Sequence, residues 1–436
     1  MPAPADPPPV GIALLGLGVV GAGVYRALHD GAATYAQRSG RRIEVRHVAV
    51  RDAQRSRGVD LASVDVGTDP LRVATMDDVE VVVEVMGGEE PAATCIRAAL
   101  DAGKHVVTAN KEVMAKHGPE LLAVAQQRGL ELLYEASVGG GIPIIAALRR
   151  DLQANEIQRL QAIINGTTNF ILTAMAHDGM SYAAALREAQ RRGYAEADPT
   201  NDVEGTDAAF KLAILASLAF HATVHPDDVY REGITRLTPR DFKYAADLGY
   251  VIRLVATAAR SDDGLDVRVH PALLSAQDPL ARVDGVLNAV AVEGDLLGRA
   301  IFEGEGAGAK PTTSAVIADL LDVVHGLVAE RRPRPLRPTD PAPCIRAIDD
   351  LHMRYYLRIL VRDRPGVLAE LGQIFAQNDI SIASLLQVEA DAVAGTAELI
   401  ITTHTAGEAD VQRFLQAAAE TESVCEVGIR IRMEGS

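Results

Sequence analysis

The sequence predicts an α/β protein with three domains: a parallel sheet wrapped by helices, an α+β domain, and a C-terminal domain with the order βαββαβ. Three observations support this prediction. Short apolar runs alternate with helical stretches up to residue 135. Helices and then strands follow in residues 136–307. A Pro- and Arg-rich segment, residues 330–343, separates the last stretch from the rest and is typical of a stiff, solvated linker.

In the first domain, near-continuous apolar character indicates parallel strands that are buried on both faces. The expected strands are Val10–Leu15, Ile43–Val50, Val79–Val85, His105–Thr108 and Leu130–Glu135. A helix expected over Ala315–Glu330 is predicted to pack back on this domain. The predicted boundaries are a disordered tail over 1–9, the first domain over 10–135 with the returning segment 308–330, the second over 136–307, the linker over 331–352 and the third over 353–436.

The second domain is expected to contain helices around Thr167–Ala176, Tyr182–Arg192 and Thr206–Phe220 and strands near Arg253–Arg260 and Ala289–Val292. The third is predicted to be ferredoxin-like. Its expected strands are Tyr355–Val361, Ser381–Glu389, Thr396–Thr403 and Val424–Met433, and its helices are Gly366–Gln377 and Glu408–Glu420.

Composition excludes several classes of function. The formal charge of −16 disfavours a nucleic-acid partner, which would require clustered Lys and Arg. No apolar run is long enough to span a membrane, and residues 1–9 lack the features of a signal peptide. The three cysteines, Cys95, Cys344 and Cys425, are far apart and follow no metal-binding spacing. We therefore expect a cytoplasmic protein that binds neither membranes nor nucleic acid.

A Gly-rich turn closes the first expected strand and opens a helix. It comprises Gly16, Leu17, Gly18, Val19, Val20 and Gly21. The first Gly permits the tight turn, the second lets a pyrophosphate approach the backbone, and the third allows close helix–strand packing. This pattern favours a Rossmann-type domain that binds a dinucleotide at the helix N-terminus. A purely structural turn is the alternative.

The end of the second expected strand bears on the cofactor. A carboxylate there holds the 2′-hydroxyl of NAD, whereas an Arg accommodates the 2′-phosphate of NADP. Arg51 comes first and Asp52 follows, with Arg55 and Arg57 beyond. We therefore expect NADP to be preferred, with NAD still possible on account of Asp52. A solvated basic loop is the alternative.

Two further features follow strands of the parallel sheet, where ligands bind in α/β folds. Gly87 and Gly88 permit close approach of a ribose or ring. Lys111 begins a helix, where the dipole disfavours a cation, so a role facing a substrate carboxylate or a cofactor phosphate is expected rather than a plain surface lysine. The segment 135–143, with its carboxylate and three glycines, could bind a hard cation through oxygen ligands or simply form a hinge.

The helix expected over Thr206–Phe220 is apolar almost all round yet carries two charges. Asp207 and Lys211 are four residues apart and share a face, which Ile214 and Leu218 continue. An amine among apolar side chains is suited to proton transfer at a carbonyl–alcohol centre. A structural buried ion pair is the alternative, although such pairs contribute little to stability.

At this point the residues resemble those of a known family. The run from Gly193 to Lys211, GYAEADPTNDVEGTDAAFK, resembles the signature of homoserine dehydrogenases. Residues 165–169 (NGTTN), 136–143 (ASVGGGIP) and 304–308 (GEGAG) are also similar to that family. The resemblance covers residues 10–330, and no aspartate-kinase segment precedes it, so the monofunctional form is expected.

The resemblance implies reversible NAD(P)-dependent reduction of L-aspartate 4-semialdehyde to L-homoserine, on the route to threonine and methionine. It implies that Lys211 is the catalytic lysine and that Asp207 orients the substrate. It further implies roles for Glu196 and the Gly193 backbone at the amino-acid end of the substrate, for Lys111 at substrate and cofactor, and for Gly306 near the nicotinamide. A sodium ion held by Glu135, Val138, Gly140 and Ile142 is also implied, as is a homodimer or homotetramer assembled through the second domain.

The C-terminal domain is similar to an ACT domain over residues 362–368 (RDRPGVL) and 378–382 (NDISI). Pro365 and Gly366 open a helix whose free amides suit an amino-acid carboxylate, and Asn378 could hydrogen-bond to it. The expected effector residues are Gly366, Val367, Leu368 and Asn378, and the resemblance implies threonine feedback. A domain that only helps to dimerise the chain is the alternative.

Two rival functions fit the sequence less well. Aspartate-semialdehyde dehydrogenase uses a cysteine nucleophile, but none of the three cysteines lies where a nucleophile could be activated. A non-catalytic amino-acid-responsive regulator would have no use for a lysine inside an apolar helix.

Overall fold

The computed structural model describes residues 7–435 apart from 56, 336, 338 and 392. Residues 1–6 of the expected N-terminal tail therefore lie outside the described residues. The described chain forms two compact units, the first from segments up to residue 157, 210–226 and 293–343, and the second from 158–209, 227–292 and 344 onward. The expected α/β class, with a parallel-sheet domain, an α+β domain and a βαββαβ domain, is confirmed.

The first unit is built on a six-stranded sheet with the order β3-β2-β1-β4-β5-β6, in which all pairings are parallel. Its strands are β1 (Val10–Leu15), β2 (Ile43–Ala49), β3 (Asp65–Gly67), β4 (Val81–Glu84), β5 (His105–Thr108) and β6 (Leu132–Leu133). This is the strand order of a dinucleotide-binding fold. All six side chains of β1 and all four of β4 are buried, as expected for central strands covered on both faces.

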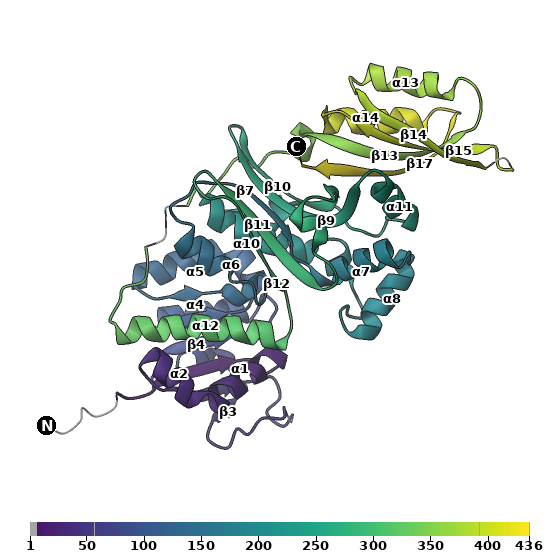
Figure 1. Ribbon diagram of the computed structural model, residues 1–436. Coiled ribbons are helices and arrows are strands. Elements are labelled where there is room, and N and C mark those ends of the chain that lie inside the picture. Colours follow the sequence, from purple (N-terminus) through teal and green to yellow (C-terminus); the bar gives the residue numbers. More distant parts are fainter. Residues whose placement is uncertain (1–6, 56, 336, 338, 392, 436) are drawn as a thin grey trace. The chain divides into compact units, whose positions relative to one another are not determined.

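Helices connect and cover these strands. They are α1 (Val19–Asp30), α2 (Ala32–Ser39), α3 (Pro70–Ala74), α4 (Ala92–Asp101), α5 (Lys111–Arg128), η1 (Glu135–Ser137), α6 (Ile144–Ala146), η2 (Ala147–Asp151) and α12 (Ala309–Val328). The short strand β12 (Gly298–Glu305) precedes α12. In Figure 1, α12 lies against α1 and α2, although these helices are far apart in the sequence.

The helix α12 is, within the described residues, the one long and apolar enough to cross a membrane by length and composition alone. Its apolar residues have another explanation. Val316, Leu320 and Val324 are fully buried in the same apolar cluster as the side chains of β1 and β4. Burial in the core of the sheet therefore accounts for the apolar character of α12.

The second unit contains a long mixed sheet in which β11, β7, β9, β10, β17, β13, β15 and β14 follow one another. Its strands are β7 (Ile157–Ile163), β8 (Tyr230–Arg231), β9 (Tyr250–Ser261), β10 (Gly264–Ser275), β11 (Leu287–Gly294), β13 (His352–Arg362), β14 (Ile382–Asp391), β15 (Thr396–Thr403), β16 (Ala406–Gly407) and β17 (Val424–Glu434). Its helices are α7 (Gly166–His177), α8 (Tyr182–Arg192), α9 (Thr200–Val203), η3 (Pro226–Asp228), α11 (Pro239–Asp247), η4 (Pro279–Arg282), η5 (Ile348–Asp350), α13 (Val367–Gln377) and α14 (Glu408–Ala419). The helix α10 (Thr206–Phe220) begins in this unit and continues into the first.

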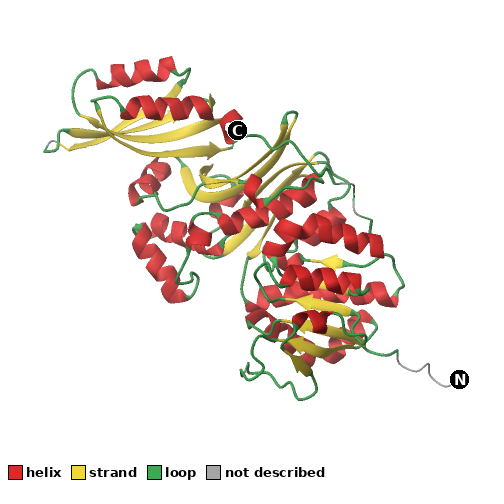
Figure 2. Cartoon of the chain, turned by 180° about the vertical axis from the view of Figure 1, so that it is seen from behind, coloured by secondary structure: helices red, strands yellow, loops and turns green. Residues whose placement is uncertain are grey.

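The C-terminal part of the second unit has the expected βαββαβ order, and Figure 2 shows α13 and α14 on one face of its strands. Phe375 of α13 and Phe414 of α14 stack with ring centroids 3.8 Å apart and fill the core between helices and sheet. The last strand, β17, pairs in parallel with β10, so this domain extends the sheet of the residues that precede it. No local sequence pattern predicts that pairing.

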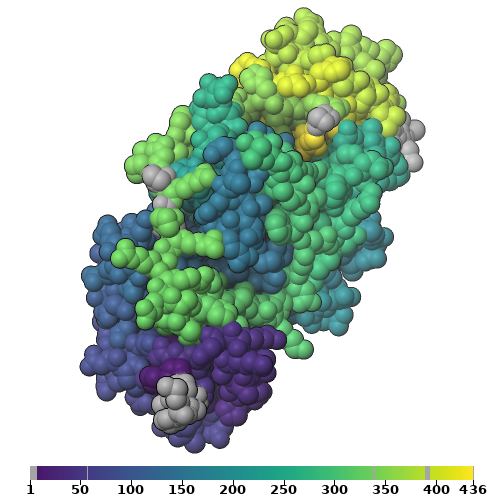
Figure 3. Space-filling model, turned by 60° about the vertical axis from the view of Figure 1, so that its left-hand side comes forward, coloured from purple at the N-terminus to yellow at the C-terminus, as the bar shows by residue number. Residues whose placement is uncertain are grey.

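The linker after α12 runs over the surface of the first unit. In Figure 3 it is the light-green segment that lies on the blue residues of that unit. Two hydrogen bonds attach it to the end of α10: the amide of Asp340 donates to the carbonyl of His221, and the amide of Thr223 donates to the carbonyl of Asp340. The linker is thus fixed to the unit that it covers.

Candidate active site

The Gly-rich turn adopts the geometry that its three glycines were expected to permit. Gly16 has a φ of 97°, a conformation that L side chains rarely adopt. A Cβ at Gly21 would lie 2.2 Å from the carbonyl oxygen of Gly16, whereas a Cβ at Gly18 would meet nothing within 4 Å. The turn is therefore tight at Gly16, close-packed at Gly21 and open at Gly18, where α1 begins. An anion can approach the free amides of α1 at this point.

A buried carboxylate, which the sequence analysis did not single out, organises the neighbouring loops. Glu84 ends β4 and is fully buried. It accepts hydrogen bonds from the hydroxyl of Thr108 (2.6 Å) and the amide of Met86 (2.7 Å). Burial raises the pKa of Glu84, and these hydrogen bonds oppose the rise. Glu84 thereby fixes the loop that contains Gly87 and Gly88.

Asn110 joins that loop to the start of α5. Its side-chain amide donates to the carbonyl of Gly88 (2.7 Å), and its oxygen accepts from the amide of Val113 (3.1 Å), which caps the helix. Lys111 is the first residue of α5 and is exposed. The cap and the loop contact together set the direction in which α5 presents Lys111.

Several of the predicted residues meet at one cavity of the first unit, with a volume of about 330 Å³. The predicted residues that line it are Val20, Gly87, Lys111, Gly140, Lys211 and Gly306. They come from α1, from the loop after β4, from α5, from the loop after η1, from α10 and from the loop after β12. Lys211 is half-buried rather than fully buried, and its side chain lines the cavity. The cavity is thus bordered by lysine side chains, by several glycines and by the start of α1.

The loop after η1 is held close to the loop after β12. A Cβ at Gly140 would lie 2.6 Å from the carbonyl oxygen of Gly306, so no side chain could be accommodated. The carboxylate of Glu135 accepts hydrogen bonds from the amides of Ile145 (2.9 Å) and Ala146 (2.6 Å). The side chain of Glu135 therefore caps α6.

The predicted residues of the second unit lie on its helices and loops. Asp207 is buried, and its carboxylate accepts a hydrogen bond of 2.9 Å from the side-chain amide of Asn165. The same amide group donates to Asp202 (2.7 Å). Asn165 is the N-cap of α7 and begins the NGTTN motif, so this motif fixes the acidic residue one helical turn before Lys211.

Glu196 and Gly193 lie in the segment that follows α8. Gly193 ends that helix with a φ of 78°, and Glu196 is exposed. The carbonyl oxygen of Glu196 accepts from the side chain of Gln190, at 3.2 Å, while no hydrogen bond to its carboxylate is found among the described residues. Its carboxylate is therefore available to a cationic group.

The two charges after β2 differ in their surroundings. The carboxylate of Asp52 accepts a hydrogen bond of 2.9 Å from the amide of Gln54, and the carbonyl of Asp52 accepts from Arg57 (2.7 Å). Arg51 is exposed. Asp52 thus stabilises its own turn, and Arg51 remains accessible from solvent.

In the C-terminal domain, the expected effector residues surround the start and the end of α13. Gly366 is the N-cap with a φ of 96°, Val367 is buried in the domain core, and Leu368 is 48% exposed. The side-chain amide of Asn378 donates to the carbonyl of Ile374 (2.9 Å). The amides at the start of α13, rather than the side chain of Val367, are therefore what a ligand could reach.

Comparison with known proteins decides the family. The profile of homoserine dehydrogenase matches residues 143–321, that of the homoserine dehydrogenase NAD-binding domain matches 16–135, and that of the ACT domain matches 355–422. Homoserine dehydrogenase of Pseudomonas aeruginosa is 42% identical over 98% of this chain and 99% of that protein. The chain belongs to the homoserine dehydrogenase family. It is an NAD(P)-dependent oxidoreductase that interconverts L-aspartate 4-semialdehyde and L-homoserine.

Solved homoserine dehydrogenases agree with the fold. The crystal structure of the enzyme from Thiobacillus denitrificans superimposes with a TM-score of 0.91, at 42% identity, over 98% of each chain. A hyperthermophilic archaeal homoserine dehydrogenase in complex with NADPH matches with a TM-score of 0.63, at 27% identity, over 75% of this chain and 99% of that chain. The family, the fold class and the enzyme class expected from the sequence are confirmed.

Proposed function

We propose that Lys211 moves the proton in this reaction. The observation that carries the proposal is that Lys211 and Lys111, from two different helices, line one cavity together with Gly87 and Gly306. The glycines leave room for a flat ring, and the lysines are the cations that line this cavity among the described residues. A cofactor ring and a carbonyl group could therefore lie in the same space.

When bound, the nicotinamide cofactor supplies the hydride in one direction and accepts it in the other. In the reductive direction the ammonium group of Lys211 donates a proton to the aldehyde oxygen, so that the charge developing on that oxygen is neutralised as the alcohol forms. In the oxidative direction the neutral amine removes the proton from the hydroxyl group. Partial burial among the apolar residues of α10 limits competition from water at this amine.

The substrate is an amino acid, and acidic groups suit its ammonium end. We assign substrate binding to Glu196, to the backbone of Gly193 and to Asp207, with Lys111 at both substrate and cofactor. The exposed carboxylate of Glu196 can pair with an ammonium group. Asp207, held by Asn165, is preorganised to orient the substrate relative to Lys211.

The cofactor assignment rests on the turn after β1 and on the charges after β2. Residues Gly16 to Gly21 would hold the pyrophosphate, because the turn leaves the amides at the start of α1 uncovered. Arg51 would hold the 2′-phosphate of NADP, since Asp52 is engaged with Gln54. NADP is therefore the preferred cofactor, with NAD as the second.

A monovalent cation would be held by oxygen atoms of the loop after η1. Among the described residues, no hydrogen bond is donated to the carbonyl oxygens of Val138 and Gly140, and those of Glu135 and Ile142 each accept one. Neutral carbonyl oxygens suit a sodium ion better than a zinc ion. Such an ion would stiffen the loop that contacts Gly306.

The ACT domain supports regulation by a small amino acid. Gly366 opens α13 and leaves the amides of Val367 and Leu368 at the helix N-terminus, where a carboxylate binds favourably. Asn378 would contribute after release from Ile374. We propose L-threonine as the effector, a homodimer or homotetramer as the assembly, and the cytoplasm as the compartment, consistent with three free cysteines.

The central experiment compares Lys211→Met with Lys104→Met. Lys104 is a surface lysine that contacts the carbonyl of Asp77 and precedes β5, at the end of that strand opposite to Lys111. Loss of a general acid–base group should lower kcat by about 10²–10⁴-fold. Equilibrium binding of NADPH, measured by fluorescence, should change little in either variant. Near-normal kcat in Lys211→Met would refute the assignment.

A further inference from the structure

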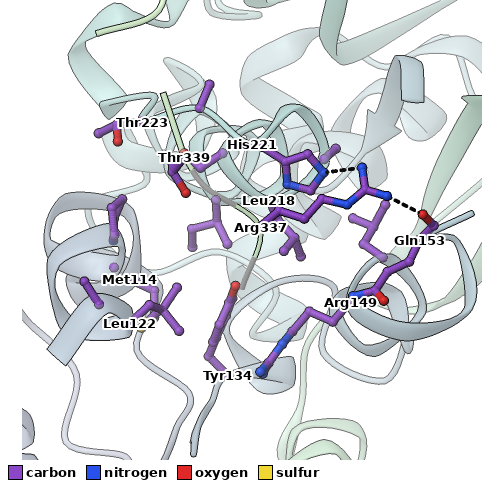
Figure 4. Close-up of a pocket in the computed structure, with 18 of the residues that line it drawn as sticks. Met114, Leu122, Tyr134, Arg149, Gln153, Leu218, His221, Thr223, Arg337 and Thr339 are labelled. Atoms are coloured by element: carbon purple, nitrogen blue, oxygen red, sulfur yellow. Dashed lines mark hydrogen bonds between the residues drawn. The ribbon is translucent and has the colours of Figure 1, made fainter. Parts of the chain in front are cut away.

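A second and larger cavity of the first unit lies beneath the linker. Its volume is about 560 Å³, within the range of small-molecule sites. Apolar side chains from α5, from the segment around η2 and from α10 form its walls. They are Met114, Leu122, Leu148, Leu152, Ile214 and Leu218. Linker residues, among them Arg337 and Thr339, close its upper side (Figure 4).

The charged groups of this cavity are arginines. Arg149, Arg334 and Arg337 line it together with His221, and its described lining includes no Asp or Glu. Arg337 donates to the carbonyl of Gln153 (2.5 Å) and lies 3.2 Å from the ring of His221, which fixes the guanidinium at the cavity wall. Arg149 lies over the ring of Tyr134, 6.0 Å from its centroid. Arg149 and Arg337 also lie 3.5 and 3.4 Å from carboxylates outside the lining, those of Glu131 and Glu156. The cavity therefore combines apolar walls with guanidinium groups along one side.

Tyr134 adds a polar group that a ligand in this cavity could contact. Its side chain is almost wholly buried, with 3% of the residue exposed, and Figure 4 shows its hydroxyl group pointing into the cavity. Among the described residues, that hydroxyl makes no hydrogen bond. The hydroxyl is open to the cavity and so can be reached by a ligand. A ligand with an acceptor group would supply the partner.

We propose that this cavity is a binding site for a small amphipathic carboxylate, distinct from the cavity that Lys211 lines. The hydrocarbon part would lie between α5 and α10, where Met114 and Leu218 project. The carboxylate would accept from Tyr134 and face Arg149 and Arg337, because charge-assisted hydrogen bonds to guanidinium groups are strong. A cationic ligand of the same length would be excluded by the three arginines.

The two cavities share two helix faces. Along α5, Lys111, Met114 and Gly118 are spaced three and then four residues apart, and so are Lys211, Ile214 and Leu218 along α10. The first member of each series lines the smaller cavity and the others line the larger one. A ligand in the larger cavity would thus contact the same faces of α5 and α10 that carry Lys111 and Lys211. We infer that its binding alters turnover.

The absence of tryptophan from the chain allows a direct test. Gln126 lines the cavity and is exposed, so Gln126→Trp should introduce one reporter without disturbing the core. The control is Leu296→Trp, at a site that is 75% exposed and outside the cavity. A bromine-labelled octanoate should quench the fluorescence of Gln126→Trp saturably, with a dissociation constant between about 0.1 and 1 mM, as expected of a ligand with few non-hydrogen atoms.

Three further measurements identify the site and its effect. Adding Tyr134→Phe to the reporter variant should weaken octanoate binding about tenfold or more, because one hydrogen bond to a charged group is lost. Octylamine should not compete with octanoate. In the wild-type enzyme, octanoate should change kcat or KM with the midpoint found by quenching. The site would be overturned by equal quenching of Leu296→Trp, by competition from octylamine, or by an unchanged affinity in Tyr134→Phe. Its link to turnover would be overturned if octanoate quenched the reporter but left kcat and KM unaltered.

Discussion

The hydroxyl group of Thr108 donates a hydrogen bond of 2.6 Å to the carboxylate of Glu84, and both side chains are fully buried. This contact joins the carboxyl ends of β5 and β4, which are neighbours in the parallel sheet. The same hydroxyl accepts a hydrogen bond from the amide of Asn110 at 3.0 Å. Two loops that line the candidate active site therefore depend on one hydroxyl group.

We expect Thr108→Val to destabilise the enzyme and to raise KM for the cofactor more than it lowers kcat. The substitution removes the donor to one oxygen of the buried carboxylate of Glu84, while the amide of Met86 still donates to the other, and the loss costs about 1–3 kcal/mol. The Gly87–Gly88 loop should become less ordered as a consequence. Chemical denaturation and steady-state kinetics measure the two effects. Thr108→Ser keeps both hydrogen bonds and should behave as wild type. If Thr108→Ser lost as much stability and raised KM as much as Thr108→Val, the effect would come from packing and not from the hydrogen bonds.

Arg51→Ala should raise KM for NADPH about 10–100-fold and leave KM for NADH nearly unchanged, since a charge-assisted hydrogen bond contributes about 1.5–3 kcal/mol. The matched control is Arg42→Ala, which removes an exposed arginine just before β2, at the opposite end of that strand. Kinetics with both cofactors give the comparison. Equal changes in KM for NADPH and NADH would show that Arg51 does not bind the 2′-phosphate.

Asp319 makes the stability of the first unit depend on pH. Burial raises its pKa from 3.8 to about 8, while the amide of Glu135, which donates to its carboxylate at 2.8 Å, opposes the shift. Between those two values the folded state holds a proton that the unfolded state lacks. The free energy of unfolding therefore falls as the pH rises through that window, and the contribution is lost above about pH 8.

Asp319→Asn retains an acceptor for the amide of Glu135 but cannot ionise. The Tm of the variant, relative to wild type, should accordingly rise between pH 5.5 and pH 8.5, by roughly 2–4 °C for each kcal/mol recovered. Differential scanning fluorimetry across that range measures the difference. The control is Asp322→Asn, three residues on, whose side chain is 65% exposed. A constant difference in Tm across the range for Asp319→Asn would show that Asp319 ionises normally.

How far the sequence could predict this molecule depends on whether a residue's role is local. The roles of Gly16 and Gly21 follow from a turn of a few residues, and the bounds of α8, Tyr182–Arg192, follow from helix periodicity. Glu84 was missed because its partner Thr108 is 24 residues away and only the sheet register brings them together. The half-burial of Lys211 was also beyond prediction, since helix periodicity gives the face of a residue but not the space in front of it.

The same limit explains the strands that were missed. The strand β10 carries Arg268 and His270 at its centre and therefore does not resemble an apolar core strand. Both side chains are buried, and they are compensated by Glu434, which lies on β17 and 166 residues from Arg268. No local pattern indicates such a partner. The pairing of β10 with β17 and the cavity around Tyr134 both arise from contacts between distant segments.

The carboxylate of Glu434 accepts a hydrogen bond of 2.7 Å from Arg268 and also pairs with Arg159. Burial opposes its ionisation, but the two arginines hold the pKa of Glu434 below its ordinary value. Glu434→Ala would leave the buried Arg268 with Asp266 as its remaining carboxylate, and removing one partner of a buried pair costs up to about 3–5 kcal/mol. We therefore expect a large loss of stability from a residue near the end of the chain.

The measurement is urea denaturation of Glu434→Ala beside Glu426→Ala, which removes an exposed carboxylate from the same strand. Glu426→Ala should change the free energy of unfolding by less than about 0.5 kcal/mol. A chain shortened before β17 should lose stability as Glu434→Ala does, because both remove the partner of Arg268 and the shortened chain also exposes the edge of β10. If Glu434→Ala were as stable as Glu426→Ala, the pairing of Glu434 with Arg268 would contribute nothing to stability, and other contacts between the C-terminal domain and the rest of its unit, such as that of Arg358 with Asp241, would hold them together.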